Sequence, residues 1–171
     1  MAIAGSTTAP SRKRLYSADE RARRDATHWT LVQGLLAPVQ FLVFAVSLVL
    51  VVRFLVTGHG YDAANVSVLV KTFFLCTIMV TGAIWEKVVF GQYLFAPAFF
   101  WEDVFSFAVI GLHMAYVYAL FAGSLTPDGL MLLALAAYAT YLINAGQFLL
   151  KLRMARLDMA GDATPEQAVA A

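Results

Sequence analysis

The sequence predicts an all-α protein, a polytopic integral membrane protein whose four transmembrane helices form one bundle. Of its 171 residues, 61% are hydrophobic and 13% are charged, whereas a soluble domain has about 45–50% apolar and about 25% charged residues. Four apolar stretches are each long enough to cross a hydrocarbon core of about 30 Å. We expect the spans at about residues 30–52, 64–85, 98–122 and 130–150.

The four spans belong to a single membrane domain, which we place at residues 17–157. A basic N-terminal tail, residues 1–16, and a C-terminal tail, residues 158–171, flank this domain. The first is predicted to be disordered and the second flexible, because both are small and polar and have little apolar surface to bury.

The first span follows a short polar helix and an interfacial tryptophan. Ser17, with Glu20 three residues later, fits a capping box and predicts a helix from about residue 18 to residue 26 on the membrane surface. Trp29 is of a type that prefers the membrane–water interface. The polar residues of the span recur at intervals of seven and share one face, which we expect to pack inward: Gln33, Gln40 and Ser47.

The second span contains one lysine near its start. Lys71 follows the turn-rich segment 57–65 by a turn or two of helix. We expect its long side chain to reach back to the interface on that side, as we expect of Arg53 at the end of the first span.

The third and fourth spans each carry a polar stripe. Ala96 and Pro97 predict the start of the third span, because proline suits the first turn of a helix, and the segment 123–129 predicts a tight turn after it. One face of the third span combines Glu102, Ser106, Val109 and His113. The stripe on the fourth span consists of Tyr138, Tyr141, Asn144 and Gln147.

Lysine and arginine lie mostly on one side of the predicted membrane. With four spans, the side that holds both termini receives ten of the 12 basic residues, and the other side receives only Arg53 and Lys71. The positive-inside rule therefore predicts that both termini and the segment 85–103 face the cytoplasm. We interpret the basic N-terminus as a membrane anchor and not as an arm for nucleic acid.

The segment 85–103, WEKVVFGQYLFAPAFFWED, has a tryptophan followed by acidic residues at each end. Charges at the rim of a membrane bundle are costly unless they pair, reach water or act on a ligand. Burial and a neighbouring carboxylate both favour a protonated carboxyl group, so Glu86, Glu102 and Asp103 are candidate general acids. The alternative is that Glu86 and Lys87 are solvated charges, and that Glu102 and Asp103 stabilise a helix N-terminus.

His113 lies about 16 Å beyond Glu102 along the third span, well inside the membrane. Such a histidine either hydrogen-bonds a neighbouring helix or binds the metal of a flat cofactor on the face that it shares with Glu102. The sequence has no motif for ATP hydrolysis, zinc proteolysis or serine hydrolysis. Its single cysteine, Cys76, excludes an internal disulfide.

One resemblance covers nearly the whole chain. It is carried by LYSADERARRDATHWTLVQGLLAPVQFLVF at 15–44, MVTGAIWEKVVFGQYLFAPAFFWEDVFS at 79–106 and LLALAAYATYLINAGQFLLKLR at 132–153. The central stretch, with WEK and FFWED, is the most specific. Together the three resemble the 2-vinyl bacteriochlorophyllide hydratase family (chlorophyllide a 3¹-hydratase) of phototrophic bacteria.

The resemblance implies a lyase of bacteriochlorophyll a biosynthesis. Such an enzyme adds water across the C3 vinyl group of chlorophyllide a, or of a related bacteriochlorin precursor, and gives the 3-(1-hydroxyethyl) product. It also implies a multi-pass protein of the bacterial inner membrane that needs no cofactor beyond the magnesium of its substrate. The expected partners are the pigment, the bilayer, and either further copies of the chain or other pigment-biosynthesis enzymes, with no nucleic acid.

The hydration chemistry gives roles to residues already named. The terminal vinyl carbon needs an acid and the attacking water needs a base, and Glu86, Glu102 and Asp103 offer both. We expect Lys87 to pair with the propionate of the pigment, and His113 or His28 to bind its magnesium. The side chains expected to stack on the pigment or to contact it are Trp85, Phe99, Phe100, Trp101, Asn144 and Gln147.

Two other functions fit the same pattern. A pigment-binding or assembly subunit without activity needs only the aromatic residues and His113, and it would leave its pigment unaltered. A small four-span transporter with an acid as proton coupler is the weaker alternative, because the acids lie at the rim and not at mid-bilayer.

Overall fold

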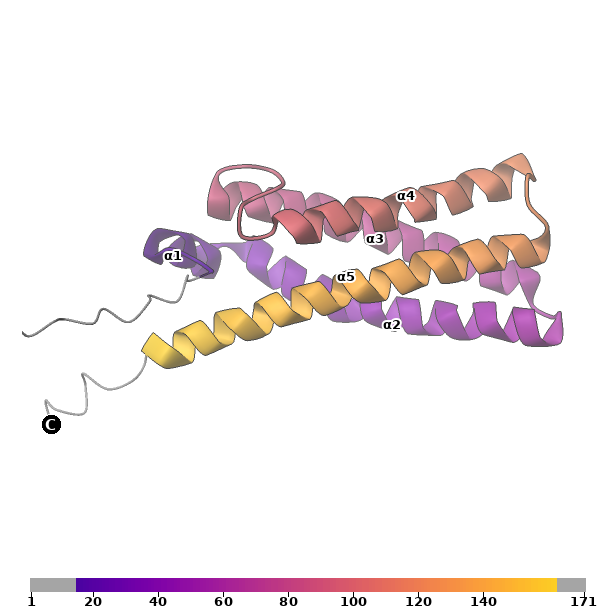
Figure 1. The fold of residues 1–171 in the computed structure, drawn as a ribbon, viewed down its shortest axis with the longest axis horizontal. Helices are drawn as coiled ribbons and strands as arrows, with labels where there is room; N and C mark the ends of the chain where they lie inside the picture. Colours follow the sequence, from indigo (N-terminus) through magenta and orange to yellow (C-terminus); the bar gives the residue numbers. More distant parts are fainter. Residues whose placement is uncertain (1–14, 163–171) are drawn as a thin grey trace, which may run out of the picture.

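The computed structural model describes residues 15–162 of the chain, and side chains as far as residue 157. Residues 1–14 and 163–171, which make up most of the two predicted tails, lie outside the described part. The described residues form helices joined by short connections, which confirms the all-α prediction (Figure 1). The helices are α1 (Ala18–Ala26), α2 (His28–Thr57), α3 (Tyr61–Phe90), α4 (Phe100–Ala122) and α5 (Pro127–Asp162).

The short helix α1 begins as the capping box predicts. The Ser17 hydroxyl accepts a hydrogen bond from the Glu20 N–H, and the Ser17 N–H donates to the Glu20 carboxylate at 2.8 Å. The helix then lies against the end of α3, where Arg23 Nε donates to Val89 O at 2.8 Å. These contacts tie the N-terminal helix to the membrane bundle.

The four long helices are each apolar and long enough to be candidate membrane spans, and they match the four predicted stretches. Three of them extend beyond the predicted bounds, whereas α4 begins only at Phe100, so the predicted helix start at Ala96 and Pro97 is wrong. The helices α2 and α3 each have 30 residues, or about 45 Å at 1.5 Å per residue, which exceeds a hydrocarbon core of about 30 Å. The last helix continues to Asp162, so residues 158–162 of the predicted tail are helical.

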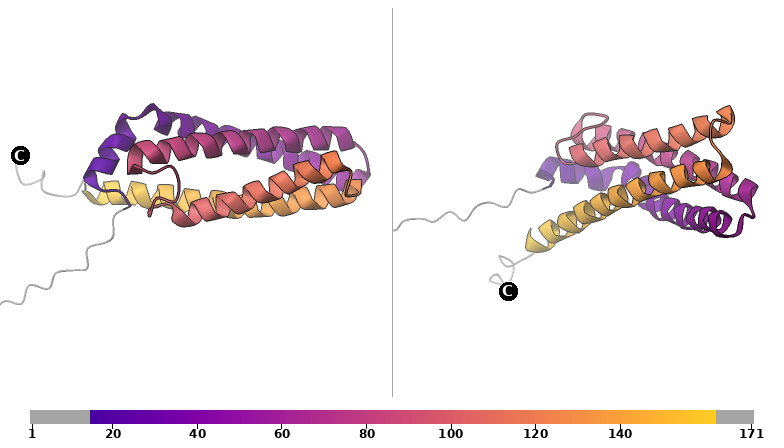
Figure 2. Two further views of the ribbon diagram at one scale, coloured as in Figure 1. Left: turned by 90° about the horizontal axis from the view of Figure 1, so that it is seen from above. Right: turned by 45° about the vertical axis from the view of Figure 1, so that its right-hand side comes forward.

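The bundle consists of two helical hairpins, α2 with α3 and α4 with α5 (Figures 1 and 2). The tight connections 58–60 and 123–126 lie at one end. The other end, here called the α1 end, holds α1, the connection 91–99 and the C-terminal part of α5 (Figure 1). Because α2 also packs on α5 and α3 on α4, the four helices enclose a common interior.

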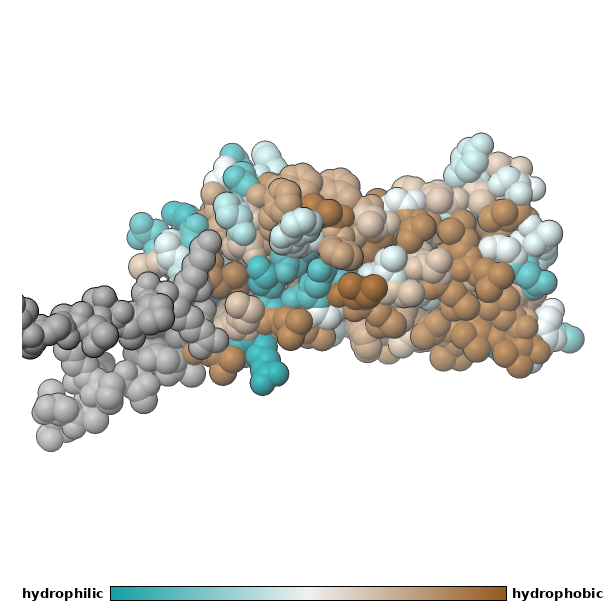
Figure 3. Space-filling model, viewed as in Figure 1, coloured by the Kyte–Doolittle hydropathy of each residue, from teal (hydrophilic) through white to brown (hydrophobic). Residues whose placement is uncertain are grey.

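That interior is aromatic, with a few paired polar groups. The ring of Phe44 lies 5.3 Å from the ring of Tyr138 and 4.9 Å from that of Tyr141, centroid to centroid. The Tyr138 hydroxyl and Ser47 Oγ are 2.5 Å apart, so this buried phenol is hydrogen-bonded across helices. Much of the outer surface in Figure 3 is apolar, as expected of a surface in contact with lipid.

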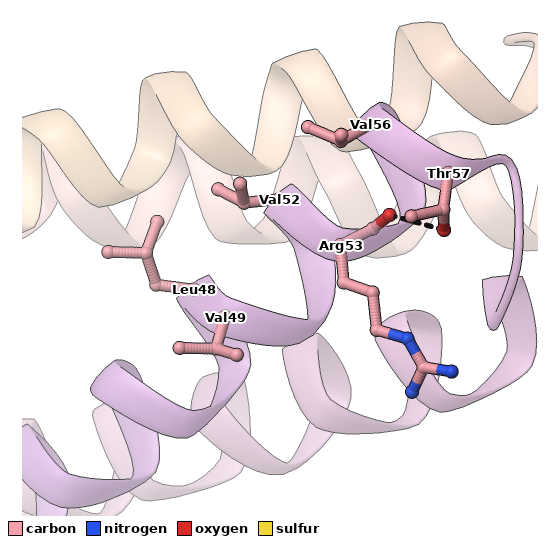
Figure 4. Close-up of a pocket in the computed structure, with 6 residues that line it drawn as sticks. All are labelled: Leu48, Val49, Val52, Arg53, Val56 and Thr57. Carbon is pink, nitrogen blue, oxygen red and sulfur yellow. Dashed lines mark hydrogen bonds between the residues drawn. The ribbon is translucent and has the colours of Figure 1, made fainter.

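The prediction for Lys71 is wrong. Its side chain is fully buried and points into the bundle instead of reaching the interface. Nζ lies 3.8 Å from the centre of the Tyr141 ring, and the amide oxygen of Gln40, with its amide turned to satisfy both neighbours, accepts from Nζ at 3.2 Å. Arg53 differs, since its guanidinium extends away from the apolar side chains of α2 (Figure 4).

Candidate active site

Two carboxyl groups hold the connection 91–99 at the α1 end. Glu86, in the last turns of α3, accepts a hydrogen bond from the Ala96 N–H at 3.2 Å. Asp103, in the first turn of α4, accepts from the Phe95 N–H at 2.6 Å. Both acids are buried, and their carboxyl groups lie close enough to interact. A proton on one of them would turn this contact into a hydrogen bond, because an ionised carboxylate can only accept.

Phe95 shows why this connection needs such support. Its φ of +59° lies in the left-handed region, which a residue with a Cβ rarely adopts and which costs about 1–2 kcal/mol. Its ring stacks on Phe107 with centroids 5.6 Å apart, and its N–H is held by Asp103. The acids of the pair therefore fix the shape of the connection.

Glu102, next to Asp103 in the sequence, has a different environment. Its side chain is 7% exposed, and Oε1 lies 3.6 Å from Lys151 Nζ on α5. Its other oxygen, Oε2, has no hydrogen-bond partner among the described residues. Lys151 also donates to Ala98 O. Glu102 is thus a buried acid with one cationic neighbour and one oxygen available to a ligand.

A row of polar groups continues from Glu102 along the seam between α4 and α5. Asn144 Nδ2 donates to Ser106 Oγ at 2.8 Å. Asn144 Oδ1 and Gln147 Oε1 are buried and, in the described part of the chain, have no partner. In Figure 3 a hydrophilic area interrupts the apolar surface between these helices, toward the α1 end. We call this row, formed by Glu102, Ser106, Asn144, Gln147 and Lys151, the polar seam.

His113 closes the inner end of the polar face of α4. Its Nδ1 lies 2.8 Å from Val109 O. Because a carbonyl oxygen only accepts, Nδ1 carries the proton and Nε2 keeps its lone pair. That nitrogen is buried and has no partner within residues 15–157. In this tautomer Nε2 can bind a metal or accept a hydrogen bond from a donor.

Aromatic rings form a cluster around Phe99, the last residue of the connection 91–99. The ring of Phe99 contacts Trp85 edge-on at 5.6 Å, Tyr16 at 6.3 Å and Phe148 at 6.1 Å, between centroids. Trp85 Nε1 donates to Thr30 Oγ1 at 3.0 Å. Burial raises the pKa of Tyr16 to about 12, so its hydroxyl stays neutral. The ring contacts and the bond to Thr30 show that Trp85 and Phe99 pack mainly against other parts of the chain.

Other predicted site residues are not brought to the polar seam. Phe100 and Trp101 are 44% and 65% exposed, which places them on the outer face of α4. Lys87 is exposed and its Nζ donates to Gly91 O at 2.7 Å, at the C-terminus of α3. His28 is exposed at the start of α2.

Two lysines differ from what the sequence predicted. Lys151, not predicted as a site residue, lies in the polar seam, and Lys71, predicted at the interface, lies in the bundle interior. Lys151 follows Asn144 and Gln147 at helical spacing and could have been added to their stripe. Lys71 follows Ala64 and Val68 at the spacing of the buried face of α3. In both cases the helical period indicated a buried position. This signal competes with the general tendency of lysine side chains to reach the membrane interface.

An open hollow of the surface lies away from the polar seam, on α2. It has a volume of about 430 Å³ and is lined by α2 alone, by Leu48, Val49, Val52, Arg53, Val56 and Thr57 (Figure 4). Its lining is almost entirely apolar, and Thr57 Oγ1 donates to Arg53 O at 2.7 Å. A groove of this kind has no acid–base groups, so it is not a candidate active site.

Comparison with known proteins decides between the functions that fit this geometry. Residues 16–154 match the family model for 2-vinyl bacteriochlorophyllide hydratase. The chain belongs to this family. It is 73% identical over 154 residues to the 2-vinyl bacteriochlorophyllide hydratase of Rhodobacter capsulatus, covering 90% of this chain and 89% of the relative. It is 74% identical over 155 residues to the protein of the same name from Cereibacter sphaeroides, covering 90% and 95%. No solved structure matches the chain.

Proposed function

We propose that the chain hydrates the C3 vinyl group of chlorophyllide a, or of a close bacteriochlorin precursor, with Glu102 as the group that exchanges protons with the substrate. Hydratase activity on a vinyl bacteriochlorophyllide follows from the family. The assignment of Glu102 comes from the structure. The observation that carries it is the buried, unpartnered Oε2 in the polar seam.

The reaction needs one proton delivered and one returned. A carboxylic acid protonates the terminal vinyl carbon, and the positive charge forms on the inner carbon, where the macrocycle delocalises it. A water oxygen then bonds to the inner carbon, and one proton of that water returns to the carboxylate. The sum is one water added to one double bond, so a single carboxyl group can act first as acid and then as base.

Glu102 suits this role better than the neighbouring pair. Glu86 and Asp103 each accept a backbone N–H of the connection 91–99 and lie close enough to interact with each other. Glu102, in contrast, has one oxygen, Oε2, with no hydrogen-bond partner in the described structure. We assign the pair to holding the connection over the site and Glu102 to the reacting carbons.

The attacking water fits beside Gln147. The side chain of Gln147 belongs to the turn of α5 next to that of Lys151, the neighbour of Glu102, and its Oε1 is an acceptor without a partner in the described structure. A water that donates one hydrogen to this oxygen can direct its lone pair at the inner vinyl carbon and its second hydrogen at Glu102. This arrangement would keep the water on the side of the carboxylate that deprotonates it.

The depth of the seam sets where the magnesium of the substrate lies. Eleven residues separate Glu102 from His113, a rise of about 16 Å. A pigment with its vinyl group at Glu102 has its centre about half as deep, near Asn144, whose Oδ1 has no partner among the described residues and is of the oxygen type that Mg²⁺ prefers. The predicted contact of His113 with the magnesium would need a deeper pigment, with the vinyl group out of reach of Glu102.

The pose agrees with a bacterial inner membrane in which the α1 end faces the cytoplasm. Most of the described basic residues gather there, on α1 and at the ends of α3 and α5, as the positive-inside rule requires. The macrocycle would enter between α4 and α5 from the lipid, and its propionate would remain among the basic groups at the head-group level.

The test is hydration by membranes that contain the Glu102→Gln variant. Glutamine has nearly the same size but cannot donate an acid proton, so we expect turnover to fall by about 10²–10⁴-fold, the usual value of a general acid–base group. The measurement is the loss of the vinyl group from chlorophyllide a, followed by the absorption shift and the mass of the product.

Asp128→Asn is the control, because Asp128 is an exposed acid at the other end of the bundle. It should retain full turnover. Wild-type turnover by Glu102→Gln would remove Glu102 from the mechanism. Pigment that binds to the wild-type protein and is recovered unchanged would instead favour a pigment-binding subunit.

A further inference from the structure

Lys71 is a buried cation that the hydration mechanism does not use. It comes from α3 and lies across the bundle interior against Tyr141 of α5, with its side chain fully buried. An amine within a candidate membrane span is costly to bury and usually marks a function. None of the carboxylates within residues 15–157 forms an ion pair with it.

The neighbours of Lys71 leave part of its hydrogen-bonding capacity available. An ammonium group has three donors. Gln40 Oε1 receives one at 3.2 Å, and Gln40 is held in turn by its own bond to Phe74 O at 3.1 Å. The face of Tyr141 receives a second. The contact with the ring face is not a hydrogen bond to an oxygen or nitrogen, so this donor can turn to an acceptor that enters the interior.

His113 lies beside this lysine and also has an unused polar atom. The His113 ring lies 5.9 Å from the ring of Tyr138, and Lys71 Nζ lies over the ring of Tyr141, one turn further along α5. Both side chains therefore face the same stretch of α5, although they come from different helices. His113 Nε2 is fully buried, carries a lone pair and has no partner in the described part of the chain. A buried polar atom without a partner calls for an explanation, and a ligand that enters the interior beside Lys71 would supply the missing partner.

We propose that Lys71 and His113 form an inner subsite that binds the exocyclic ketone of the pigment, with Lys71 donating a hydrogen bond to the carbonyl oxygen. The proposal rests on the proposed function, because it takes the pigment to be the ligand. In this proposal, Lys71 selects the substrate and sets its position. His113 lines the subsite beside the carbonyl group.

The length of the macrocycle fits the distance between the two ends of the site. In a chlorophyllide the ring ketone lies on the edge opposite the C3 vinyl group. From the vinyl carbon to the carbonyl oxygen the molecule spans about 13 Å, at bond lengths of roughly 1.2–1.5 Å. Glu102 and His113 are about 16 Å apart along α4. A pigment aligned with the seam can therefore place its vinyl group at Glu102 and its ketone near the depth of His113, where we place the inner subsite.

The same alignment explains why the substrate would be hydrated at only one edge. A pigment inserted the other way round would bring an apolar vinyl group to Lys71 and leave the lysine without an acceptor, which is unfavourable in a buried site. The carbonyl contact thus fixes which edge of the ring meets the acid.

The experiment compares two substrates on wild-type protein and on Lys71→Met, in membranes. The substrates are chlorophyllide a and its analogue in which the ring ketone is reduced to a methylene group. Methionine fills the space of lysine without a donor, and replacing a buried charge by an apolar side chain is often tolerated. Pigment affinity is measured by absorption titration, and KM and kcat of hydration are measured beside it.

For the wild type we expect the analogue to bind about tenfold or more weakly than chlorophyllide a, since a hydrogen bond to a charged donor is lost. For Lys71→Met we expect chlorophyllide a to bind as weakly as the analogue. We also expect kcat to fall, because the pigment can then bind with its vinyl group away from Glu102. Lys71→Gln keeps a donor and should recover part of the discrimination.

Equal discrimination by wild type and Lys71→Met would overturn the subsite, as would a loss of affinity in Lys71→Met that is the same for both pigments, which is what a structural role predicts. Failure of the hydratase proposal has a different signature. The wild type would then bind and discriminate the two pigments through Lys71 but would hydrate neither.

Discussion

Glu86 with Asp103 and Glu102 with its seam neighbours form two acidic regions at the same end of one bundle, and they use their carboxyl groups in opposite ways. In the first region, each carboxyl group accepts a backbone N–H of the connection 91–99 and lies beside the other carboxyl group. In the second, one oxygen faces Lys151 and the other has no partner in the described structure. The contrast shows that adjacent acids in a sequence can divide into one that shapes a connection and one that is available for chemistry.

The physical basis of the contrast is hydrogen-bond satisfaction. A buried acceptor that is fully paired contributes to the stability of the fold, whereas one left unpaired costs about 1–3 kcal/mol. Such a cost is tolerated where a ligand or a water supplies the missing partner. Changes in the first region should therefore alter stability first, and changes in the second should alter turnover first.

Asp103→Ala should have the largest effect on stability. It removes the acceptor for the Phe95 N–H and the partner of Glu86, so we expect a loss of about 1–3 kcal/mol. Asp103→Asn keeps an acceptor oxygen and should lose clearly less. The measurement is thermal unfolding of the protein in detergent, followed by circular dichroism. If Asp103→Ala unfolds at the wild-type temperature, Asp103 does not hold the connection.

Lys151→Met should reduce turnover with little change in stability. It removes the cation 3.6 Å from Glu102, which helps the carboxylate form once the proton has been delivered. We expect kcat to fall about tenfold, or about 1.4 kcal/mol. In the Glu102→Gln background the same change should cost little more, because the two residues act together. Full additivity of the two losses would show that Lys151 acts independently of Glu102.

Phe95→Gly compared with Phe95→Ala isolates the backbone strain in the connection 91–99. Both variants lose the ring contact with Phe107, but only glycine adopts a φ of +59° at no steric cost. We therefore expect the glycine variant to be more stable than the alanine variant by about 1 kcal/mol, by the same unfolding measurement. The reverse order would mean that the connection relaxes when the ring is lost.

Lys87→Met should have the smallest effect and tests the predicted contact of Lys87 with the propionate of the pigment. Its Nζ donates to Gly91 O at the surface, so we expect a change in stability within about 0.5 kcal/mol and an unchanged KM. A KM raised severalfold for chlorophyllide a, but not for its propionate methyl ester, would instead restore Lys87 to the binding site.

The helices were largely predictable, because their signals are local. A run of apolar residues as long as the membrane is thick needs no knowledge of its neighbours, and the capping box of Ser17 and Glu20 is complete within four residues. The shared face of Glu102, Ser106, Val109 and His113 also followed from the helical period, and all four are buried. The sequence by itself thus determined the candidate spans, their order and the polar faces of α4 and α5.

Only the tertiary structure decided what each polar group faces. The pairing of Glu86 with Asp103, the approach of Lys151 to Glu102 and the inward position of Lys71 all join residues of different helices. Such contacts depend on the rotation and relative height of the helices, which packing sets and no local pattern encodes. For this reason the sequence named three acids together, and the fold separated the one with a free oxygen from the two that hold the connection.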